Sequence, residues 1–399
     1  MRIAAILAAS MLVSGAARAD DRPVRLGLMN DQSSIYADTG GPGSAVAARM
    51  AIEDAGGRVL GRPVELVVAD HQNKADLGAS IARKWYDADG VSAIFDIVNS
   101  AVSLAVQDYA RAQSKIVVHV GSANADLFGK ACARTGAMWM WDTDALPRAI
   151  TQGIIADGGK SWFFVTADYS FGHALERSTA AVVAAKGGRV VGSVRHPFGA
   201  SDFASFLLQA QSSGADVIGM ANAGGDTINF IKQAAEFGIK GSKQRLVALI
   251  FSIYNVHSLG LATAQSIRYV EGFYWDETAE TRAWADRFAR RHRGSRPSAN
   301  HAYVYSAVRH YLRAAEAAQS LDGPAVMAKM KEMAVSDFFI KNARLREDGR
   351  LLNDMLLVEV KRPAESAGAW DYLKIVARIP AASIVRPLAE GGCSFATQR

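Results

Sequence analysis

Short apolar runs alternate with longer stretches of helical character through the first third of the chain. The runs are continuously apolar, which is typical of strands buried on both faces of a parallel sheet. We therefore predict strands at residues 24–29, 64–69, 93–98 and 116–120, followed by an aromatic segment at residues 138–141. The intervening helices are expected at residues 45–55, 75–87 and 102–112.

The same pattern restarts near residue 162. Strands are expected at residues 162–166, 190–194, 217–220 and 246–251, and helices at residues 174–185, 203–211 and 227–237. Repeated strand–helix units imply right-handed crossovers and a doubly wound α/β architecture. No linker rich in Pro or Ser separates the two series. The sequence therefore predicts two similar α/β lobes, each built on a parallel sheet.

Beyond residue 273 the pattern becomes helical, with apolar stripes at residues 283–293 and 302–319. Two further strands are expected at residues 355–360 and 372–377, separated by a turn that contains proline. Long helices that follow the second series indicate that the chain returns to cover the first lobe.

The N-terminus has the pattern of a secretory signal peptide. Arg2 precedes a short apolar run at residues 3–13, and Ala17-Arg18-Ala19 is a small-x-small cleavage pattern. The run is shorter than the roughly 20 apolar residues that span a bilayer. We expect cleavage near Ala19, export, and no lipid anchor, since no Cys follows that site.

The length of 399 residues exceeds what one ordinary core supports and favours two domains. The formal net charge of +6 is modest, and its densest basic patch, residues 290–296, is interpreted as a solvated helix end. We therefore expect no nucleic-acid partner. Cys132 and Cys393 are predicted to form a disulfide in an oxidising compartment, with two buried thiols as the alternative. Two cysteines and scattered histidines lack the spacing of a zinc site.

Polar residues follow two neighbouring strands of the first series. In open parallel sheets, ligands bind beyond the carboxyl ends of the strands. Asn99-Ser100-Ala101 opens a helix after one strand, and Ser122-Ala123-Asn124 follows the next. Because helix N-termini favour anions, the two loops together predict a clamp for a carboxylate. Ordinary helix caps are the alternative for both.

Other candidate ligand contacts also follow predicted strands. The loop at residues 39–44 is rich in glycine but lacks the Lys-Ser/Thr of a phosphate loop and the dinucleotide spacing, so no nucleotide is expected. Trp141 stands at the crossover between the two series, where hinge packing is as plausible as ligand stacking. The remaining candidates beside strand ends are Tyr36, Tyr169, Phe171, Asn222, Asp226 and Phe251.

Signals for catalysis are weak. The chain has no G-x-S-x-G nucleophile elbow. His292, His301 and His310 recur every nine residues, a spacing that puts neighbours on opposite faces of a helix and makes a poor metal set. We expect neither an enzyme nor a cofactor.

Nearly the whole chain after the signal peptide resembles the branched-chain amino-acid-binding group of periplasmic solute-binding proteins. No single motif is diagnostic, but the order and spacing of several are specific. The segments that carry the resemblance are Ala69-Asp70-His71-Gln72-Asn73-Lys74, Gly90-Val91-Ser92-Ala93-Ile94, Asn99-Ser100-Ala101, Thr166-Ala167-Asp168-Tyr169-Ser170-Phe171-Gly172, Ala221-Asn222-Ala223-Gly224-Gly225-Asp226, Glu271-Gly272-Phe273-Tyr274 and Glu347-Asp348-Gly349-Arg350.

The resemblance implies two doubly wound lobes joined by a hinge of three crossovers, with a small-molecule ligand held between them. The first lobe would comprise residues 20–142 and 273–350, and the second residues 143–272 and 351–399. A monomeric periplasmic protein that delivers its ligand to the membrane permease and ATPase of an ABC importer is implied. The predicted clamp matches the carboxylate grip of the group, and Tyr36 and Phe171 match aromatics that cover the ligand body.

One departure from the group bears on the ligand. Amino-acid binders of this kind hold the ligand ammonium with an acidic residue after the fourth strand of the second lobe. Here residues 251–255 contain no carboxylate. Asp226 or Asp168 would have to substitute, or the ligand carries no ammonium. We therefore predict a carboxylate with an apolar or aromatic body, with an amino acid as the alternative ligand. A ligand-sensing subunit and, more remotely, a secreted hydrolase are the alternative functions.

Overall fold

The computed structural model describes residues 22–239 and 243–396. The predicted signal peptide, residues 1–19, lies outside the described residues. None of the helices in the described ranges combines the length and the apolar character needed to cross a bilayer.

The first lobe is built on a six-stranded sheet in the order β2-β3-β1-β4-β5-β6. All its pairings are parallel except the short hairpin of β2 with β3 at one edge. Apolar runs such as Ile-Val-Val in β5 are fully buried, as expected for strands covered on both faces. The strands are β1 (Val24–Asn30), β2 (Arg58–Val59), β3 (Arg62–Asp70), β4 (Val91–Asp96), β5 (Ile116–His119) and β6 (Gly136–Met138).

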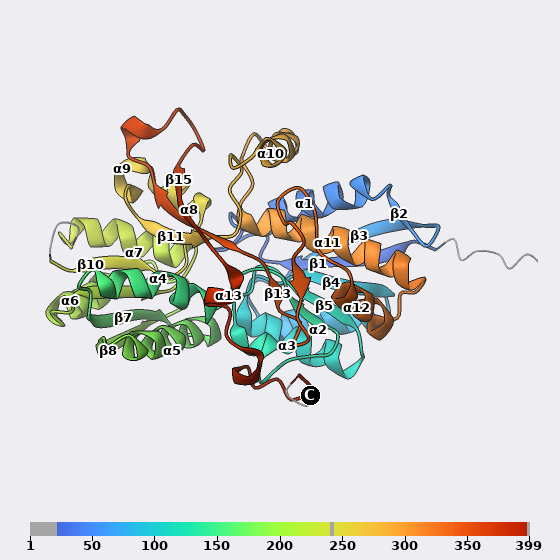
Figure 1. Ribbon diagram of the computed structural model, residues 1–399, viewed down its shortest axis with the longest axis horizontal. Coiled ribbons are helices and arrows are strands. Elements are labelled where there is room, and N and C mark those ends of the chain that lie inside the picture. Colours follow the sequence, from blue (N-terminus) through green and yellow to red (C-terminus); the bar gives the residue numbers. More distant parts are fainter. Residues whose placement is uncertain (1–21, 240–242, 397–399) are drawn as a thin grey trace, which may run out of the picture.

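Helices cover both faces of this sheet (Figure 1). α2 (Ala75–Asp87) and α3 (Ser100–Ala112) pack together on one face. The other face carries α1 (Gly41–Asp54), α11 (Ala299–Ala318) and α12 (Gly323–Glu332). The prediction that late helices return to the first lobe is confirmed, since α11 packs on α1 and β4.

The second lobe has a four-stranded parallel sheet in the order β10-β9-β7-β8. α4 and α5 pack on one face, whereas α6 and α7 supply a separate apolar cluster on the other. The elements are α4 (Ala145–Ala156), β7 (Ser161–Ala167), α5 (Ser170–Ala185), β8 (Arg189–His196), α6 (Ala204–Ser212), β9 (Val217–Ala221), α7 (Gly225–Glu236), β10 (Arg245–Ala248), α8 (Ile253–Leu259) and α9 (Leu261–Ala264).

Three strands differ from the expected pattern. No residue of β3 is fully buried, so the prediction of burial on both faces is wrong for this strand. β8 is mostly exposed because it is the edge strand of its sheet, so the prediction of burial on both faces is wrong there. The strand predicted over residues 246–251 ends at Ala248, and residues beyond it lead into α8, whose N-cap is Ser252.

A three-stranded antiparallel sheet, β11-β14-β15, adjoins the second lobe. Figure 1 shows β15 running from the second lobe toward the junction of the lobes. The remaining elements are η1 (Ala125–Phe128), β11 (Arg268–Glu271), α10 (Ala279–Arg291), the β12–β13 hairpin (Arg344–Leu345 and Leu351–Leu352), β14 (Met355–Val360), η2 (Pro363–Glu365), β15 (Leu373–Ile379), α13 (Ala381–Ile384) and η3 (Leu388–Glu390).

The chain passes between the lobes three times, after β6, after β11 and after β13. A buried ion pair joins the first and third passages: Nε of Arg350 lies 2.7 Å from Oδ2 of Asp142. The backbone of Arg350 also bridges to Met138 at the end of β6. The hinge is therefore held by charge and by backbone pairing.

The C-terminal tail returns to the first lobe. Cys393 forms a disulfide with Cys132, with the two Cα atoms 5.6 Å apart. Arg386 pairs with Asp144 at 2.6 Å and donates a second hydrogen bond to the carbonyl of Ala125. Although residues 351–399 were expected to belong to the second lobe, this tail contacts residues 125–132 of the first.

We expect the disulfide to stabilise the protein. Loop-entropy arguments give roughly 5 kcal/mol, as an upper value, for a bridge with a sequence separation of 261. Replacing Cys132 and Cys393 together with Ser should lower the melting temperature by several degrees in calorimetry under oxidising conditions. A reductant should destabilise the wild type but leave the double variant unaffected. Equal melting temperatures for the two oxidised proteins would contradict this prediction.

Candidate functional site

A tight loop after β1 positions Tyr36. The carboxylate of Asp31 accepts hydrogen bonds from the backbone N–H groups of Ser33, Ser34 and Tyr36 at 3.2, 2.8 and 2.9 Å, and from Nδ2 of Asn73 at 2.8 Å. Burial raises the pKa of Asp31, but hydrogen bonds from these groups outweigh burial and lower it. The carboxylate therefore fixes the loop that carries Tyr36.

A second buried carboxylate ties the strand ends of the first lobe together. Asp96, at the end of β4, accepts hydrogen bonds from Nδ2 of Asn30 at 2.8 Å, Nδ2 of Asn300 at 3.1 Å and the N–H of Gly121 at 3.1 Å. Burial raises the pKa of Asp96. Because its partners come from β1, α11 and the loop after β5, Asp96 fixes the position of that loop.

The two asparagines of the predicted clamp act as local helix caps. Oδ1 of Asn99 accepts hydrogen bonds from the N–H groups of Ala101 and Val102 at 2.9 and 3.3 Å. Oδ1 of Asn124 accepts from the N–H of Asp126 at 3.0 Å. Both oxygens are thus engaged at the starts of α3 and η1, as the cap interpretation anticipates.

The two serines of the predicted clamp lie side by side. The hydroxyl of Ser122 donates to that of Ser100 at 3.3 Å, and both residues are buried. Ser100 is the first residue of α3, so the pair stands at a helix N-terminus, where partial positive charge favours an anion. The structure therefore brings one residue from each predicted loop together.

Aromatic side chains meet between the lobes. The hydroxyls of Tyr36 and Tyr169 are 2.5 Å apart, which joins the first lobe to the second. The ring of Phe198 packs edge-on against both, with centroids at 5.7 and 5.0 Å, and Phe171 lies 5.9 Å from Tyr169. Burial raises the pKa of both phenols, so each remains protonated at neutral pH.

Asp226 lies beside the tyrosine pair. It is buried, and Oδ2 accepts a hydrogen bond from the N–H of Gly199 at 3.2 Å. Among the described residues, Oδ1 has no hydrogen-bond partner. Burial raises the pKa of Asp226 to about 6, and its charge helps to raise the pKa values of Tyr36 and Tyr169. A hydrogen-bond donor beside Oδ1 would therefore stabilise the ionised carboxylate of Asp226.

Asn222 serves the second lobe internally. Its Nδ2 lies 3.2 Å from Nε2 of His196, and its Oδ1 accepts a hydrogen bond from the hydroxyl of Thr227 at 2.8 Å. Each end of the amide makes one contact within the lobe.

A cavity of about 50 Å³ lies between the lobes, and none of the side chains that line it is charged. We call it the cleft cavity. Six predicted site residues line it: Tyr36, Ala123, Trp141, Tyr169, Phe171 and Phe251. The other predicted residues, Asn99, Ser100, Ala101, Ser122, Asn124, Asn222 and Asp226, lie outside this lining. The residues missed by sequence reasoning are Thr39, Val98, Gly121, Ala223, Gly224, Ile250, Ser252 and Asn255.

Most of the missed residues directly adjoin polar loops that were identified at strand ends, so position in the sequence was the available signal.

One polar group in the lining has no hydrogen-bond partner among the described residues. The indole N–H of Trp141 is buried and has no acceptor among the described residues. A ligand acceptor in the cleft cavity would satisfy it.

The lobes also meet backbone to backbone. The N–H of Gly225 donates to the carbonyl of Ile35 at 3.2 Å. Gly224 has a φ of 58°, and an added Cβ would lie 2.5 Å from the Ile35 oxygen and 2.7 Å from the Tyr36 ring. Glycine is therefore required for this close approach of the lobes.

Residues 23–369 match the family model described as periplasmic binding protein. The chain belongs to the periplasmic binding protein family. This agrees with the resemblance expected from sequence, and the two-lobed α/β fold agrees with it too. No curated protein matches the chain.

Solved structures extend the comparison. A periplasmic binding protein from Burkholderia mallei shares 45% identity with a TM-score of 0.91, covering 93% of this chain and 98% of its own. A branched chain amino acid ABC transporter periplasmic ligand-binding protein from Burkholderia xenovorans shares 39% identity with a TM-score of 0.83, covering 94% and 100%. A solute binding protein from R. palustris in complex with benzoate shares the fold at 18% identity, with a TM-score of 0.81 and coverage of 94% and 100%.

We expect Gly224→Ala to favour separation of the lobes, because the added methyl group meets the first lobe only when the two are in contact. The radius of gyration from small-angle X-ray scattering should exceed that of the wild type. Gly187→Ala is the matched control, since Gly187 also has a positive φ but nothing within 4 Å of an added Cβ. The same radius in both variants would count against this account of the contact.

Asp226 should make stability depend on pH. Its folded pKa, about 6, lies above the ordinary value, so ionisation costs the folded protein stability as pH rises through that range. Asp226→Asn should therefore raise the free energy of unfolding above pH 6, by up to about 3 kcal/mol, and have little effect near pH 4. Denaturant titrations at both pH values test this. The exposed Asp108→Asn is the control, and a pH-independent effect of Asp226→Asn would refute the prediction.

Proposed function

We propose that this periplasmic binding protein is the solute-binding component of an ABC importer. Its ligand is a small organic carboxylate with an apolar or aromatic body, which it encloses between the lobes. The main support is the lining of the cleft cavity, which contains five aromatic side chains and no charged side chain. Such a lining favours an apolar body over an ionic one, because a buried charge needs a partner.

The serine pair supports a carboxylate as the polar end of the ligand. Ser100 begins α3, and Ser122, in the loop after β5, contacts its hydroxyl. Gly121 and Ala123, on either side of Ser122, line the cleft cavity. Two hydroxyl donors with a helix N-terminus suit an anion. Ser122 would turn its hydroxyl proton from Ser100 to the carboxylate, with Ser100 as the neighbouring donor.

Closure supplies the mechanism. The Tyr36–Tyr169 hydrogen bond and the contact of Ile35 with Gly225 form only when the lobes meet. A ligand that touches both lobes binds the closed state better than the open one and shifts the population toward it. The closed form would then be the state that the permease and ATPase partners recognise.

A second candidate ligand is an α-amino acid, and Asp226 favours it. The carboxylate lies beside Tyr36 and Tyr169, and its Oδ1 has no partner among the described residues. An ammonium group would satisfy that oxygen and reverse the rise in its pKa. Asp226 is not part of the lining of the cleft cavity, so we place this ligand second.

Matched ligand pairs separate the two candidates. Phenylpropanoate and phenylalanine differ only in the α-ammonium group, as do 4-methylpentanoate and leucine. We expect the acids, together with benzoate, to raise the melting temperature and the amino acids to have little effect. Stabilisation by the amino acids alone, and its loss in Asp226→Asn, would establish the second candidate instead. Stabilisation by neither class would contradict both.

The grip is tested by Ser122→Ala. Loss of a hydrogen bond to a charged carboxylate should weaken binding of the responding acid by about tenfold or more in calorimetric titration. Ser103→Ala is the matched control, since Ser103 is buried like Ser122 but lies on α3 and donates to the carbonyl of Ile97. Equal affinities for the two variants would reject the serine grip.

A further inference from the structure

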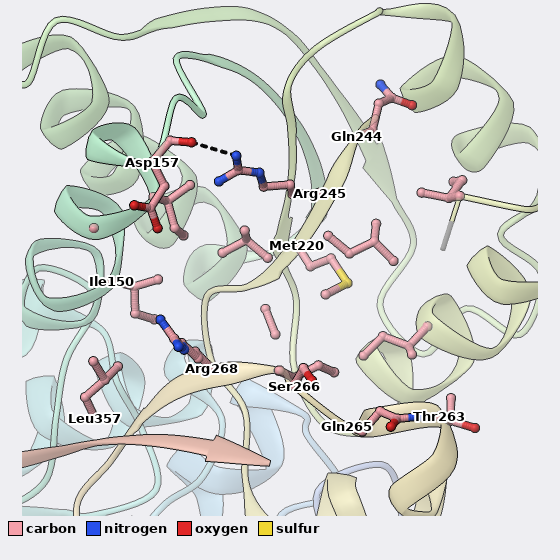
Figure 2. Close-up of a pocket in the computed structure, with 18 of the residues that line it drawn as sticks. Ile150, Asp157, Met220, Gln244, Arg245, Thr263, Gln265, Ser266, Arg268 and Leu357 are labelled. Carbon is pink, nitrogen blue, oxygen red and sulfur yellow. Dashed lines mark hydrogen bonds between the residues drawn. The ribbon is translucent and has the colours of Figure 1, made fainter. Parts of the chain in front are cut away.

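A second pocket lies inside the second lobe (Figure 2). We call it the distal pocket; residues 244–248 and 265–268 bound it together with α4 and α7. Its volume of about 530 Å³ falls in the range of roughly 300–1,000 Å³ that is typical of small-molecule sites. It shares no lining residue with the cleft cavity, so it is a separate site.

The edge of β10 and the segment that leads into β11 face each other across the distal pocket. Every residue in the ranges 244–248 and 265–268 lines it. Successive side chains of a strand point to opposite faces, so the consecutive residues of β10 line the pocket along a strand edge. Residues 265–267 form the turn that leads into β11, which begins at Arg268. In the described part of the chain, β10 pairs with β9 and β11 with β14, in separate sheets. The pocket therefore fills the gap between two sheets.

The edge of β10 presents polar backbone groups to this gap. The N–H of Arg245 donates to the carbonyl of Asp216, on the β9 side. Because backbone groups alternate in direction along a strand, those of Leu246 and Ala248 point toward the pocket. No backbone pairing between β10 and β11 is present in the ranges described. The backbone groups of Leu246, next to Arg245, can pair with the polar end of an occupant.

The walls between the two edges are aliphatic. α4 contributes Ile150 and Ile154, α7 contributes Ile231, and Met220 and Leu357 come from β9 and β14. These side chains surround the pocket from both faces of the sheet. They favour an occupant with a flexible apolar body.

The rim carries a cation that lacks a carboxylate partner. Nη2 of Arg245 donates to the carbonyl of Asp157 at 2.6 Å, the contact drawn in Figure 2. Within the described ranges, no ion pair reaches Arg245, whereas Arg268 on the same rim pairs with Glu359 at 2.6 Å. The carboxylate of Asp157 also lies on the rim. Four of the five guanidinium N–H groups of Arg245 stay available for an anion.

We infer that the distal pocket is a second ligand site, for an aliphatic carboxylate of medium chain length. The carboxylate lies on Arg245 at the start of β10, and the chain lies against the aliphatic side chains of α4, α7 and β14. This site is independent of the ligand proposed for the cleft cavity.

Octanoate is the probe, titrated calorimetrically into the intact protein at millimolar concentration. Ala235 lines the pocket from an exposed position on α7, so Ala235→Trp should fill the pocket and abolish binding. Arg245→Gln should weaken binding at least about tenfold, through loss of a charge-assisted hydrogen bond. Octylamine, which has the opposite charge, should not bind.

Each variant has a matched control beside it in sequence. Glu236→Trp and Lys243→Gln change exposed neighbours that do not line the pocket, and both should bind octanoate as the wild type does. The inference is overturned if the wild type does not bind octanoate, or if Ala235→Trp and Arg245→Gln bind it as tightly as their controls, which would locate binding elsewhere. Circular dichroism checks folding. Should Ala235→Trp fail to fold, the Arg245→Gln and Lys243→Gln pair decides.

Discussion

The ion pair of Asp142 with Arg350 is the interaction on which the arrangement of the lobes depends. Both side chains are almost fully buried, at 1% and 0% exposed, and one lies on the first passage between the lobes while the other adjoins the third. The second oxygen of Asp142 accepts the N–H of Ala145 at 2.9 Å, so the same carboxylate starts α4. Removing either partner would leave a buried charge unpaired, at a cost of about 3–5 kcal/mol.

The position of the cleft depends on this hinge. Parallel strands place their carboxyl ends along one edge of each sheet, and the hinge turns the two edges toward each other. Asp31 and Asp96 then hold the first-lobe loops by hydrogen bonds rather than by apolar packing. The second lobe contributes Gly224, where any larger residue would prevent the close contact with the backbone of the first lobe. Rigid loops on one side and close approach on the other leave only a small space.

Sequence patterns were sufficient to predict the two α/β lobes because buried parallel strands are continuously apolar and alternate with helices along the chain. They also predicted Tyr36 and Phe171 as ligand contacts from their places beside strand ends, and both residues line the cleft cavity. Sequence patterns did not decide the role of a side chain that has two possible partners. Asn99 at a helix start suits a cap or an anion equally, and only the position of its oxygen decides. Val98 and Ile250 were missed because an apolar residue at a strand end reads as core, and lining depends on how two lobes meet.

The link between Cys132 and Cys393 has a consequence for how the molecule matures. Cys393 follows every strand of both lobes in the described residues, and a protein chain is synthesised from its N-terminus. The bridge therefore cannot close until the strands of both lobes have been made. Oxidation of this pair is a late covalent step, which takes place after all strands of the two lobe sheets have been synthesised. A thiol-reactive label would thus distinguish newly made molecules from finished ones.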